Sequence, residues 1–339
     1  TLYEAKIQTI LLNALESNSI TFHENISKSN DNRIFIVSVG TPIDDLSNPL
    51  IGNLENAVKE VGQNLRKGDT VIVRSTVPVG TTRTVVKKIL EDESGLKAAS
   101  EFSLASAPER TLQGLALEEL RNLSQIIGGI DEKSIENAVS IFNKITRTIV
   151  RVSSLEAAEL IKLFDNTYRD ITISIGNLFG KICEELKLDA KEVINAANYG
   201  YSRNKILFPG AGVGGGCLVK DPYLLLASMK GKIDLNLIKT SRKINDSMIL
   251  DTINLIEQSF DKASRKIDDA KILVLGFAFK GYPNTDDIRF SPTLPIIEYL
   301  KKMNAKIFGY DPVVPEKEIK NLGISYTSNI YSEKKFDTI

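Results

Sequence analysis

The densest group of potentially reactive side chains follows a glycine-rich run in the second half of the chain. Five glycines fall within residues 210–216, and after them come Cys217, Lys220 and Asp221. Glycines let backbone amides approach a ligand closely, and a thiol at the start of a helix can act as a nucleophile. The alternative is a flexible loop followed by a buried, inert cysteine. The thiol, ammonium and carboxylate together favour the catalytic interpretation.

A second group lies on a segment that the sequence predicts to be helical. Lys162 and Asn166 are four residues apart, so both project from one face of a helix. An ammonium beside a side-chain amide can stabilise a developing oxyanion. Lys162 could instead form an exposed ion pair with Glu159, and for this helix taken alone that pairing is the more common arrangement.

Four loops that follow apolar runs carry further candidates. Three of them occupy residues 40–42, 74–82 and 106–110. Ligands of open α/β sheets bind beyond the carboxyl ends of the strands, so three such loops in series predict a cleft, although each alone could be a simple turn. The fourth, 276–281, lacks the second glycine of a dinucleotide fingerprint. Lys280 and the later Arg289 would suit the phosphates of a nucleotide.

The elements that position these groups follow from the hydrophobic pattern. Apolar runs at 34–39, 70–74 and 102–105 alternate with helical spacing, as in a doubly wound α/β domain with a parallel sheet. The pattern resumes at residues 271–311 as strand, helix and parallel strand. Between these regions, residues 154–188 contain no proline and predict a helix of about 30 residues. A helix of that length usually joins domains or forms a subunit interface.

Composition excludes several classes of function. The 339 residues contain 43 Lys+Arg and 43 Asp+Glu, so no basic excess indicates a nucleic-acid or anionic-membrane partner. No run approaches the ~18 apolar residues of a membrane span, and the first residues do not resemble a signal peptide, so we expect a cytoplasmic protein. Two cysteines and one histidine argue against a disulfide framework, a metal site and histidine-based catalysis.

In this order, the motifs resemble the nucleotide-sugar 6-dehydrogenases, the UDP-glucose/GDP-mannose dehydrogenase family. The resemblance covers nearly the whole chain, through residues 39–42, 75–82, 107–110, 159–166, 214–221 and 279–292. It implies two Rossmann-like domains joined by a long central helix and a small helical domain. The implied domains are an NAD-binding domain at 1–152 that lacks its first βαβ unit, a central dimerisation and catalytic domain at 153–262, and a UDP-binding domain at 263–339 that also ends early.

The resemblance further implies the reaction and the roles of individual residues. A C6 hydroxyl of a UDP-hexose is oxidised by four electrons with NAD, through a thiohemiacetal and a thioester on Cys217. Lys162 and Asn166 would stabilise the oxyanion, and Asp221 would position or activate water. Glu109 would assist thioester hydrolysis, and Thr76 would lie near the nicotinamide or the reacting water. The residues expected at NAD are Gly40, Thr41, Pro42, Ser75, Thr76, Glu109, Lys220 and Arg289. Those expected at the UDP-sugar are Glu109, Arg110, Lys162, Asn166, Arg169, Phe208, Gly210, Gly214, Phe279 and Lys280.

The substrate and the class of function each have alternatives. Arg110 after Glu109, and the run 209–217, are similar to the N-acetylhexosamine branch and favour UDP-N-acetyl-D-mannosamine over UDP-N-acetylglucosamine or UDP-glucose. The resemblance also implies a homodimer through the long helix. A two-electron 3-hydroxyacid dehydrogenase, which needs no thiol, and a catalytically silent nucleotide-sugar binder are the competing classes.

Overall fold

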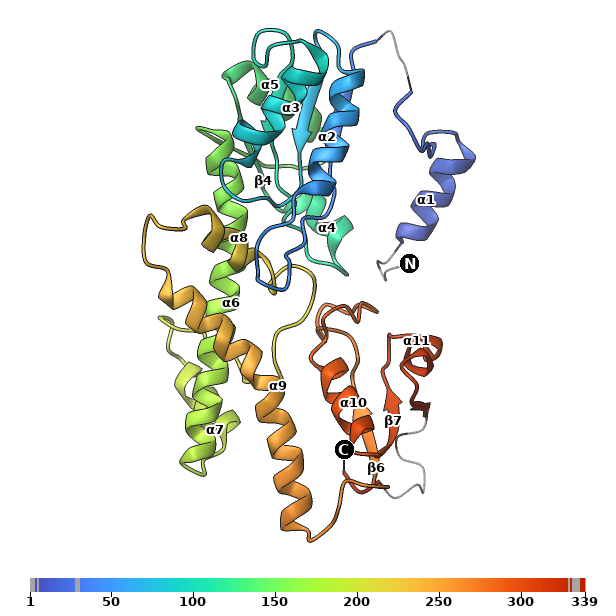
Figure 1. Cartoon of the computed structure of the whole chain (residues 1–339), viewed down its shortest axis with the longest axis vertical. Helices are drawn as coiled ribbons and strands as arrows, with labels where there is room; N and C mark the ends of the chain where they lie inside the picture. The colour runs from blue at the N-terminus through green and yellow to red at the C-terminus, as the bar shows by residue number, and fades with distance from the viewer. Residues whose placement is uncertain (1–3, 5, 28–30, 329, 331–335, 339) are drawn as a thin grey trace. The chain divides into compact units, whose positions relative to one another are not determined.

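The computed structural model describes residues 4, 6–27, 31–328, 330 and 336–338. The chain forms two compact units, which are described separately below. The N-terminal unit comprises residues 4–167 and 220–234, and the C-terminal unit comprises residues 168–219 and 235–339. The helix α6, Leu155–Glu185, contributes its first part to the N-terminal unit and its second part to the C-terminal unit (Figure 1). The domain boundaries predicted at residues 152 and 262 stay predictions.

The N-terminal unit is built on a five-stranded sheet with the order β1-β2-β3-β4-β5. Its strands are β1 Ile34–Val37, β2 Thr70–Val73, β3 Ser103–Ser106, β4 Gln125–Gly129 and β5 Ile149–Val152. The first three are parallel, as predicted, and β5 is parallel to β4. The expectation of a parallel sheet is wrong between β3 and β4, which are antiparallel. The chain leaves β3 at its carboxyl end and re-enters the sheet from that end, so β4 must run backwards.

Helices cover both faces of this sheet, so it is doubly wound as the sequence predicts. The helices before β5 are α1 Ile7–Glu16, α2 Gly52–Asn64, α3 Lys87–Ser94, α4 Ala116–Asn122 and α5 Glu132–Phe142, with a π-helical turn at Thr82–Val86. Val71 and Val73 belong to the apolar core that α2 and α3 cover, whereas the intervening Ile72 packs in the core beneath α5. This alternation is the period of two that a strand imposes on its side chains. It leaves the carboxyl ends of β1, β2 and β3 free to carry loops.

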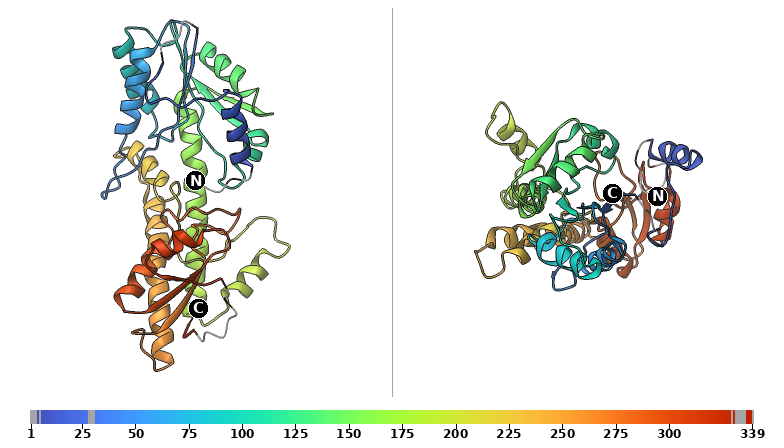
Figure 2. Two further views of the ribbon diagram at one scale, coloured as in Figure 1. Left: turned by 90° about the vertical axis from the view of Figure 1, so that its right-hand side faces the viewer. Right: turned by 90° about the horizontal axis from the view of Figure 1, so that it is seen from above.

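The helix α6 has 31 residues, which confirms the predicted long helix. The Ser154 hydroxyl accepts a hydrogen bond of 3.1 Å from the Ala157 amide and so caps its start. Two further helices follow α6, α7 Ala190–Asn198 and α8 Asp221–Ser228. In the C-terminal unit the second part of α6 runs beside α9, Asn236–Lys262 (Figure 2), and hydrogen bonds between buried side chains join the two.

The sheet of the C-terminal unit has three parallel strands, β6 Lys271–Leu275, β7 Lys306–Tyr310 and β8 Ser325–Tyr326. The connection from β6 to β7 runs through α10, Thr293–Lys302, which buries Ile296, Ile297 and Leu300. Helix α11, Glu316–Asn321, precedes β8. The predicted strand, helix and parallel strand are therefore confirmed. Within the described ranges, no helix combines the length and the apolar character needed to cross a bilayer.

Candidate active site

The loops after β1 and β2 are held together by hydrogen bonds at the carboxyl edge of the N-terminal sheet. The Ser75 hydroxyl donates to the Val39 carbonyl at 2.8 Å, and the Thr41 hydroxyl donates to the Thr76 carbonyl. Ser75 and Thr41 are both buried. Gly40 faces open space, because a Cβ placed there would meet no atom within 4 Å. The predicted NAD-contacting residues of these two loops therefore lie together, with room beside Gly40 for a ligand.

Glu109, on the loop after β3, is fixed by two partners. The Arg74 guanidinium forms an ion pair with its Oε2, and the Thr111 amide donates to its Oε1 at 2.5 Å. Burial raises the pKa of the Glu109 carboxyl, but Arg74 and the Thr111 amide more than offset that effect and hold the pKa below its ordinary value. Glu109 is therefore an ionised carboxylate at neutral pH.

Arg110, predicted to contact the sugar, is bound to a residue of α6. Its Nε donates to the Asp165 carboxylate at 2.7 Å, and its Nη1 donates to the Ser124 carbonyl at 3.2 Å. The guanidinium therefore joins the loop after β3 to the long helix. The side chain keeps 20% of its surface exposed.

The alternative pairing of Lys162 with Glu159 is wrong. Glu159 accepts hydrogen bonds from the amides of Gly80 at 2.5 Å and Thr82 at 2.8 Å. It is buried, and burial raises the pKa of its carboxyl above the ordinary value. Lys162 is 8% exposed and makes no hydrogen bond or ion pair with any other described residue. Its ammonium is therefore available to a bound ligand.

Asn166 and Asp221 contact each other in the N-terminal unit. The Asn166 amide donates to Asp221 Oδ2 at 2.5 Å, and Lys220 Nζ lies 2.6 Å from Asp221 Oδ1. The Asp221 side chain is fully buried and begins α8, while Asn166 is 5% exposed. A buried carboxylate needs such partners, since its desolvation would otherwise be costly. The structure thus brings together three of the predicted site residues, with Lys220 committed to Asp221.

The glycines before Cys217 accommodate neighbouring backbone and rings in the C-terminal unit. A Cβ on Gly214 would lie 2.6 Å from the Phe290 carbonyl oxygen, and one on Gly215 would lie 2.7 Å from the Phe279 ring. Gly215 also has φ +83°, which favours glycine. The Cys217 thiol that follows is exposed, so the alternative of a buried, inert cysteine is wrong.

Arg289 lies close enough to Cys217 for their charges to interact. Its hydrogen bonds to Asp287 are the main reason that the Arg289 pKa is raised, and the charge on Cys217 adds to the rise. The Asp287 bonds are 2.7–3.0 Å long, and the Arg289 side chain is 61% exposed. The Gly215 amide donates a hydrogen bond of 3.0 Å to the Arg289 carbonyl, so Arg289 lies at the glycine-rich loop within the C-terminal unit. That Arg289 contacts NAD stays a prediction.

A network of buried, hydrogen-bonded side chains supports the glycine-rich loop. The Gly210 amide donates to Asn177 Oδ1 at 2.9 Å, and the Asn177 amide donates to Asn245 Oδ1 at 2.9 Å. Asn245 in turn donates to Asp170 at 2.8 Å. Arg242 binds Asp170 at 2.5 Å and the Leu218 carbonyl, next to Cys217, at 3.5 Å. The network therefore contacts the loop on both sides of its central residues.

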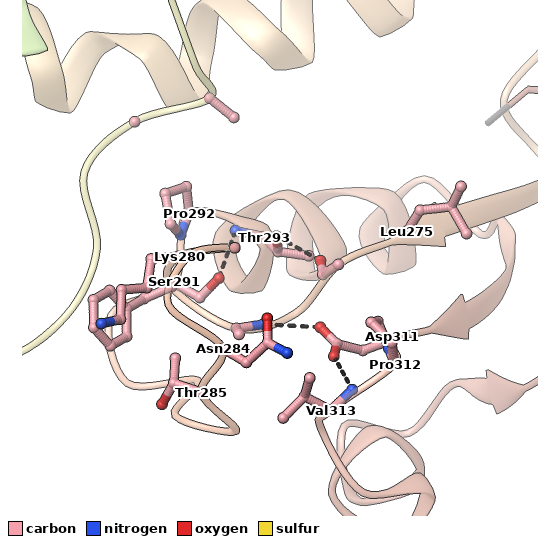
Figure 3. Close-up of a pocket in the computed structure, with 16 residues that line it drawn as sticks. Leu275, Lys280, Asn284, Thr285, Ser291, Pro292, Thr293, Asp311, Pro312 and Val313 are labelled. Atoms are coloured by element: carbon pink, nitrogen blue, oxygen red, sulfur yellow. Dashed lines mark hydrogen bonds between the residues drawn. The ribbon is translucent and has the colours of Figure 1, made fainter. Parts of the chain in front are cut away.

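A pocket of about 360 Å³ opens at the carboxyl ends of β6 and β7. Its wall includes Phe279 and Lys280, two of the residues expected at the UDP-sugar, and Gly212 from the glycine-rich loop. Ser291 and Thr293 line it at the start of α10 (Figure 3). The start of a helix presents unpaired backbone amides and a positive dipole end, which suits phosphate groups.

Asp311, at the end of β7, shapes this pocket. It accepts hydrogen bonds from the amides of Ala278 at 3.2 Å and Val313 at 2.8 Å (Figure 3). The amides of Phe277 at 2.8 Å and Val314 at 2.9 Å also donate to it. Burial raises the pKa of the Asp311 carboxyl, but these backbone bonds lower it below its ordinary value. Asp311 therefore ties together the loops that follow β6 and β7.

Some predicted residues lie elsewhere, and some site residues were missed. Arg169 and Phe208 are exposed in the C-terminal unit and do not line the pocket, nor do Gly210 and Gly214. The sequence did not predict Gln125 near Glu109, or Thr293 and Asp311 at the pocket. Arg74 and Ser291 lie in the segments 74–82 and 279–292 that the sequence singled out, but neither residue was given a role. Asp311 directly follows a strand, which is the sequence signal that could have selected it.

Comparison with known proteins gives consistent matches along the chain. Three models of the UDP-glucose/GDP-mannose dehydrogenase family match it, the NAD binding domain at residues 1–146, the central domain at 156–247 and the UDP binding domain at 273–338. UDP-N-acetyl-D-mannosamine dehydrogenase of Pyrococcus horikoshii is 35% identical over 92% of this chain and 73% of its own length. The enzyme of that name from Methanocaldococcus jannaschii is 32% identical over 91% and 68%.

Solved structures agree with these matches. The structure of the Pyrococcus horikoshii UDP-D-ManNAc dehydrogenase matches this chain with a TM-score of 0.84. The match covers 92% of this chain and 73% of the Pyrococcus chain. That of a UDP-N-acetyl-mannosamine dehydrogenase from Staphylococcus aureus is 31% identical, with a TM-score of 0.80 and coverage of 93% and 72%. A UDP-glucose dehydrogenase from Pyrobaculum islandicum is 26% identical, with a TM-score of 0.83 and coverage of 97% and 76%.

Proposed function

The chain belongs to the UDP-glucose/GDP-mannose dehydrogenase family, and we propose that it oxidises the C6 hydroxyl of a UDP-hexose to a carboxylate. It is an NAD-dependent UDP-sugar dehydrogenase by its family. We propose UDP-N-acetyl-D-mannosamine as the substrate, because relatives with 31–35% identity carry that name. UDP-N-acetylglucosamine and UDP-glucose are the alternatives.

One observation carries the proposal: the exposed Cys217 thiol follows a loop that lines the pocket of the C-terminal unit. When bound, NAD accepts a hydride from C6 in each of the two oxidations. After the first, the Cys217 sulfur adds to the aldehyde carbon, and the oxygen gains a proton, giving a thiohemiacetal. Transfer of the C6 hydride to NAD, with loss of the hydroxyl proton to water, leaves a thioester. Water then attacks the thioester carbon, the carbon–sulfur bond breaks, and the carboxylate and free thiol are formed.

Side chains of the N-terminal unit supply the polar groups that this chemistry needs. Lys162 has no protein counter-ion among the described residues, so we propose that it and Asn166 stabilise the negatively charged oxygen at C6. Asp221, bonded to Asn166, would orient water, and Glu109 would take up a proton in thioester hydrolysis. Thr76 would lie at the nicotinamide or the reacting water.

We propose that the pocket of the C-terminal unit holds the uridine diphosphate. Phe279 offers an aromatic face, and Lys280 a positive charge for a phosphate. Ser291 and Thr293 would add hydroxyl groups at the start of α10, where the helix dipole favours an anion. NAD would bind at the carboxyl edge of the other sheet, in the N-terminal unit, where Gly40 leaves open space beside Thr41 and Ser75.

We also propose a homodimer through α6, as the family resemblance implies. An apolar stripe on this helix is exposed, and its members are Tyr168, Ile175, Phe179 and Ile182. Their spacing of seven, four and three residues keeps them on one face. We expect light scattering to give twice the chain mass, and Phe179→Glu with Ile182→Glu to reduce it to one chain. A single-chain mass for the unaltered protein would contradict the dimer.

The reaction is tested by counting NADH with a panel of UDP-hexoses. We expect two NADH per UDP-N-acetyl-D-mannosamine, and the Cys217→Ser variant should stop after one. Cys183→Ser, at the buried cysteine, is the matched control and should still give two. Two NADH from the Cys217→Ser variant would rule out the thioester route. One NADH from the unaltered protein would favour a two-electron dehydrogenase, and UDP-sugar binding without turnover would favour a silent binder.

A further inference from the structure

Arg74 has a position in the N-terminal unit that the proposed reaction does not yet use. Its guanidinium spans two partners, with Nη2 on Glu109 Oε2 and Nη1 on Gln125 Oε1 at 3.0 Å. The Phe142 ring lies against it, 5.1 Å from the guanidinium carbon to the ring centroid. Only 11% of the Arg74 side chain is exposed. A guanidinium held by two hydrogen-bonded partners and a ring has one defined orientation.

The same contacts fix the loop that carries Glu109. The Gln125 amide donates to the Pro108 carbonyl at 3.3 Å, and the Glu109 amide donates to the Arg74 carbonyl at 3.4 Å. The Thr111 amide occupies the other carboxylate oxygen, Oε1. Arg74 and Gln125 therefore hold the loop at its backbone, while Arg74 and Thr111 hold the carboxylate itself.

The charge of Arg74 also favours the ionised form of Glu109. Burial raises the pKa of the Glu109 carboxyl and so opposes its ionised form. The Arg74 charge is the largest of the influences that bring this pKa below its ordinary value. A carboxylate that is to accept a proton from water must first be ionised.

We propose that Arg74 is the positioning residue of Glu109 and fixes the orientation in which its carboxylate takes a proton from water during thioester hydrolysis. The proposal rests on the proposed function of Glu109. In this step the water oxygen bonds to the thioester carbon while Glu109 takes the water proton. The carbon–sulfur bond then breaks with its electron pair on sulfur, and Cys217 is regenerated when the proton returns to it.

The alternative is that Arg74 only stabilises the sheet edge. Both roles predict a lower melting temperature when Arg74 is replaced, but only the positioning role predicts a change in one chemical step and in its pH dependence. A displacement of about 1 Å from a catalytic geometry can cost about 10²-fold in rate. We therefore expect Arg74→Gln to slow thioester hydrolysis 10- to 100-fold and leave the first NADH unaffected.

The experiment is a single turnover with UDP-N-acetyl-D-mannosamine and NAD, in which the acyl group on Cys217 is trapped with hydroxylamine. Arg74→Gln should accumulate the acyl-enzyme, and Arg74→Lys should recover part of the rate because it restores a cation. The acidic limb of the hydrolysis rate should move to higher pH in Arg74→Gln, since the pKa of Glu109 rises. Arg151→Gln is the matched control, an exposed arginine of the same unit paired with Glu132, and should behave as the unaltered enzyme.

Two outcomes separate this proposal from its premise. If Arg74→Gln melts earlier but hydrolyses at the unaltered rate with the same acidic limb, the positioning role is overturned and the proposed function stands. If Glu109→Gln also hydrolyses at the unaltered rate, Glu109 is not the proton acceptor, and the premise fails. Slow hydrolysis in both variants, with partial recovery in Arg74→Lys, supports the proposal.

Discussion

The carboxyl edges of the two sheets are organised by opposite means. In the N-terminal unit, side chains hold the loops together through the contacts of Thr41, Ser75 and Arg74. In the C-terminal unit, the edge encloses a pocket of about 360 Å³, and closely packed glycines and one carboxylate, Asp311, arrange the backbone around it. The first arrangement places charged groups for chemistry, and the second leaves room for a large ligand. The difference is consistent with the proposal that the nucleotide binds at the C-terminal edge and that the N-terminal edge contributes charged groups to the reaction.

The largest effect is expected from Lys162→Ala in the N-terminal unit. Removal of one oxyanion donor costs about 10²–10³-fold in kcat. The affinity for UDP should be unchanged if the nucleotide binds in the pocket of the C-terminal unit, as proposed. Steady-state kinetics and UDP calorimetry measure both. Lys88→Ala, at an exposed lysine paired with Asp92, is the control. A Lys162→Ala variant that loses UDP affinity and keeps kcat would contradict the proposal that the nucleotide binds at the C-terminal edge.

The second effect concerns the packed glycines of the C-terminal unit. Gly214→Ala places a Cβ 2.6 Å from a backbone oxygen that cannot easily move, whereas Gly216→Ala meets no atom within 4 Å. We expect Gly214→Ala to lower the free energy of unfolding by about 1–3 kcal/mol and Gly216→Ala to leave it nearly unchanged. Denaturant titration measures the difference. Equal values for the two variants would show that the loop does not depend on this close packing.

Asp311 predicts how the stability of the C-terminal unit changes with pH. Its folded-state pKa lies below the ordinary 3.8, so its stabilising contribution is present above that value and is lost as the pH falls through the folded-state pKa. Asp311→Asn should cost about 1–2 kcal/mol at neutral pH and weaken the dependence on acid. Unfolding curves between neutral pH and pH 2 test this. An unchanged acid dependence in Asp311→Asn would contradict the assignment.

The smallest effect should come from Lys280→Ala, which removes one phosphate contact from a pocket with several other donors. We expect UDP to bind roughly three- to tenfold more weakly, or about 0.7–1.4 kcal/mol, with NAD affinity unchanged. Calorimetry with each ligand measures this, and Lys302→Ala, at an exposed lysine near the end of α10, is the control. Weaker NAD binding in Lys280→Ala would mean that the pocket takes the dinucleotide.

The sequence predicted the elements whose apolar spacing is local, including β1, β2, the long α6 and the β6-α10-β7 connection. It did not predict the direction of β4, because a short apolar run in a sheet carries no information on orientation. The partner of Glu159 was missed for a related reason. That carboxylate binds the backbone amides of Gly80 and Thr82, which lie more than 70 residues earlier in the chain.

The candidate site shows the same limit. The residue types of Cys217, Lys162 and Asn166 indicated chemistry, since a thiol, an ammonium and an amide are recognisable in a sequence. The ion pair of Arg74 with Glu109 joins residues 35 positions apart and becomes visible only once β2 and β3 lie side by side. Gly214 and Gly215 were expected to leave space for a ligand. The space beside them is occupied by the Phe290 backbone and the Phe279 ring of the protein itself.

The network of Asp170, Asn177, Arg242 and Asn245 constrains how this protein can diverge. All four residues are at most 2% exposed, and each depends on another for its hydrogen bonds. Loss of one partner from a buried charged pair costs about 3–5 kcal/mol, a large share of the stability of most proteins. Replacement of one of these residues alone should therefore destabilise the fold, and we expect related proteins that differ here to carry compensating replacements at the other positions.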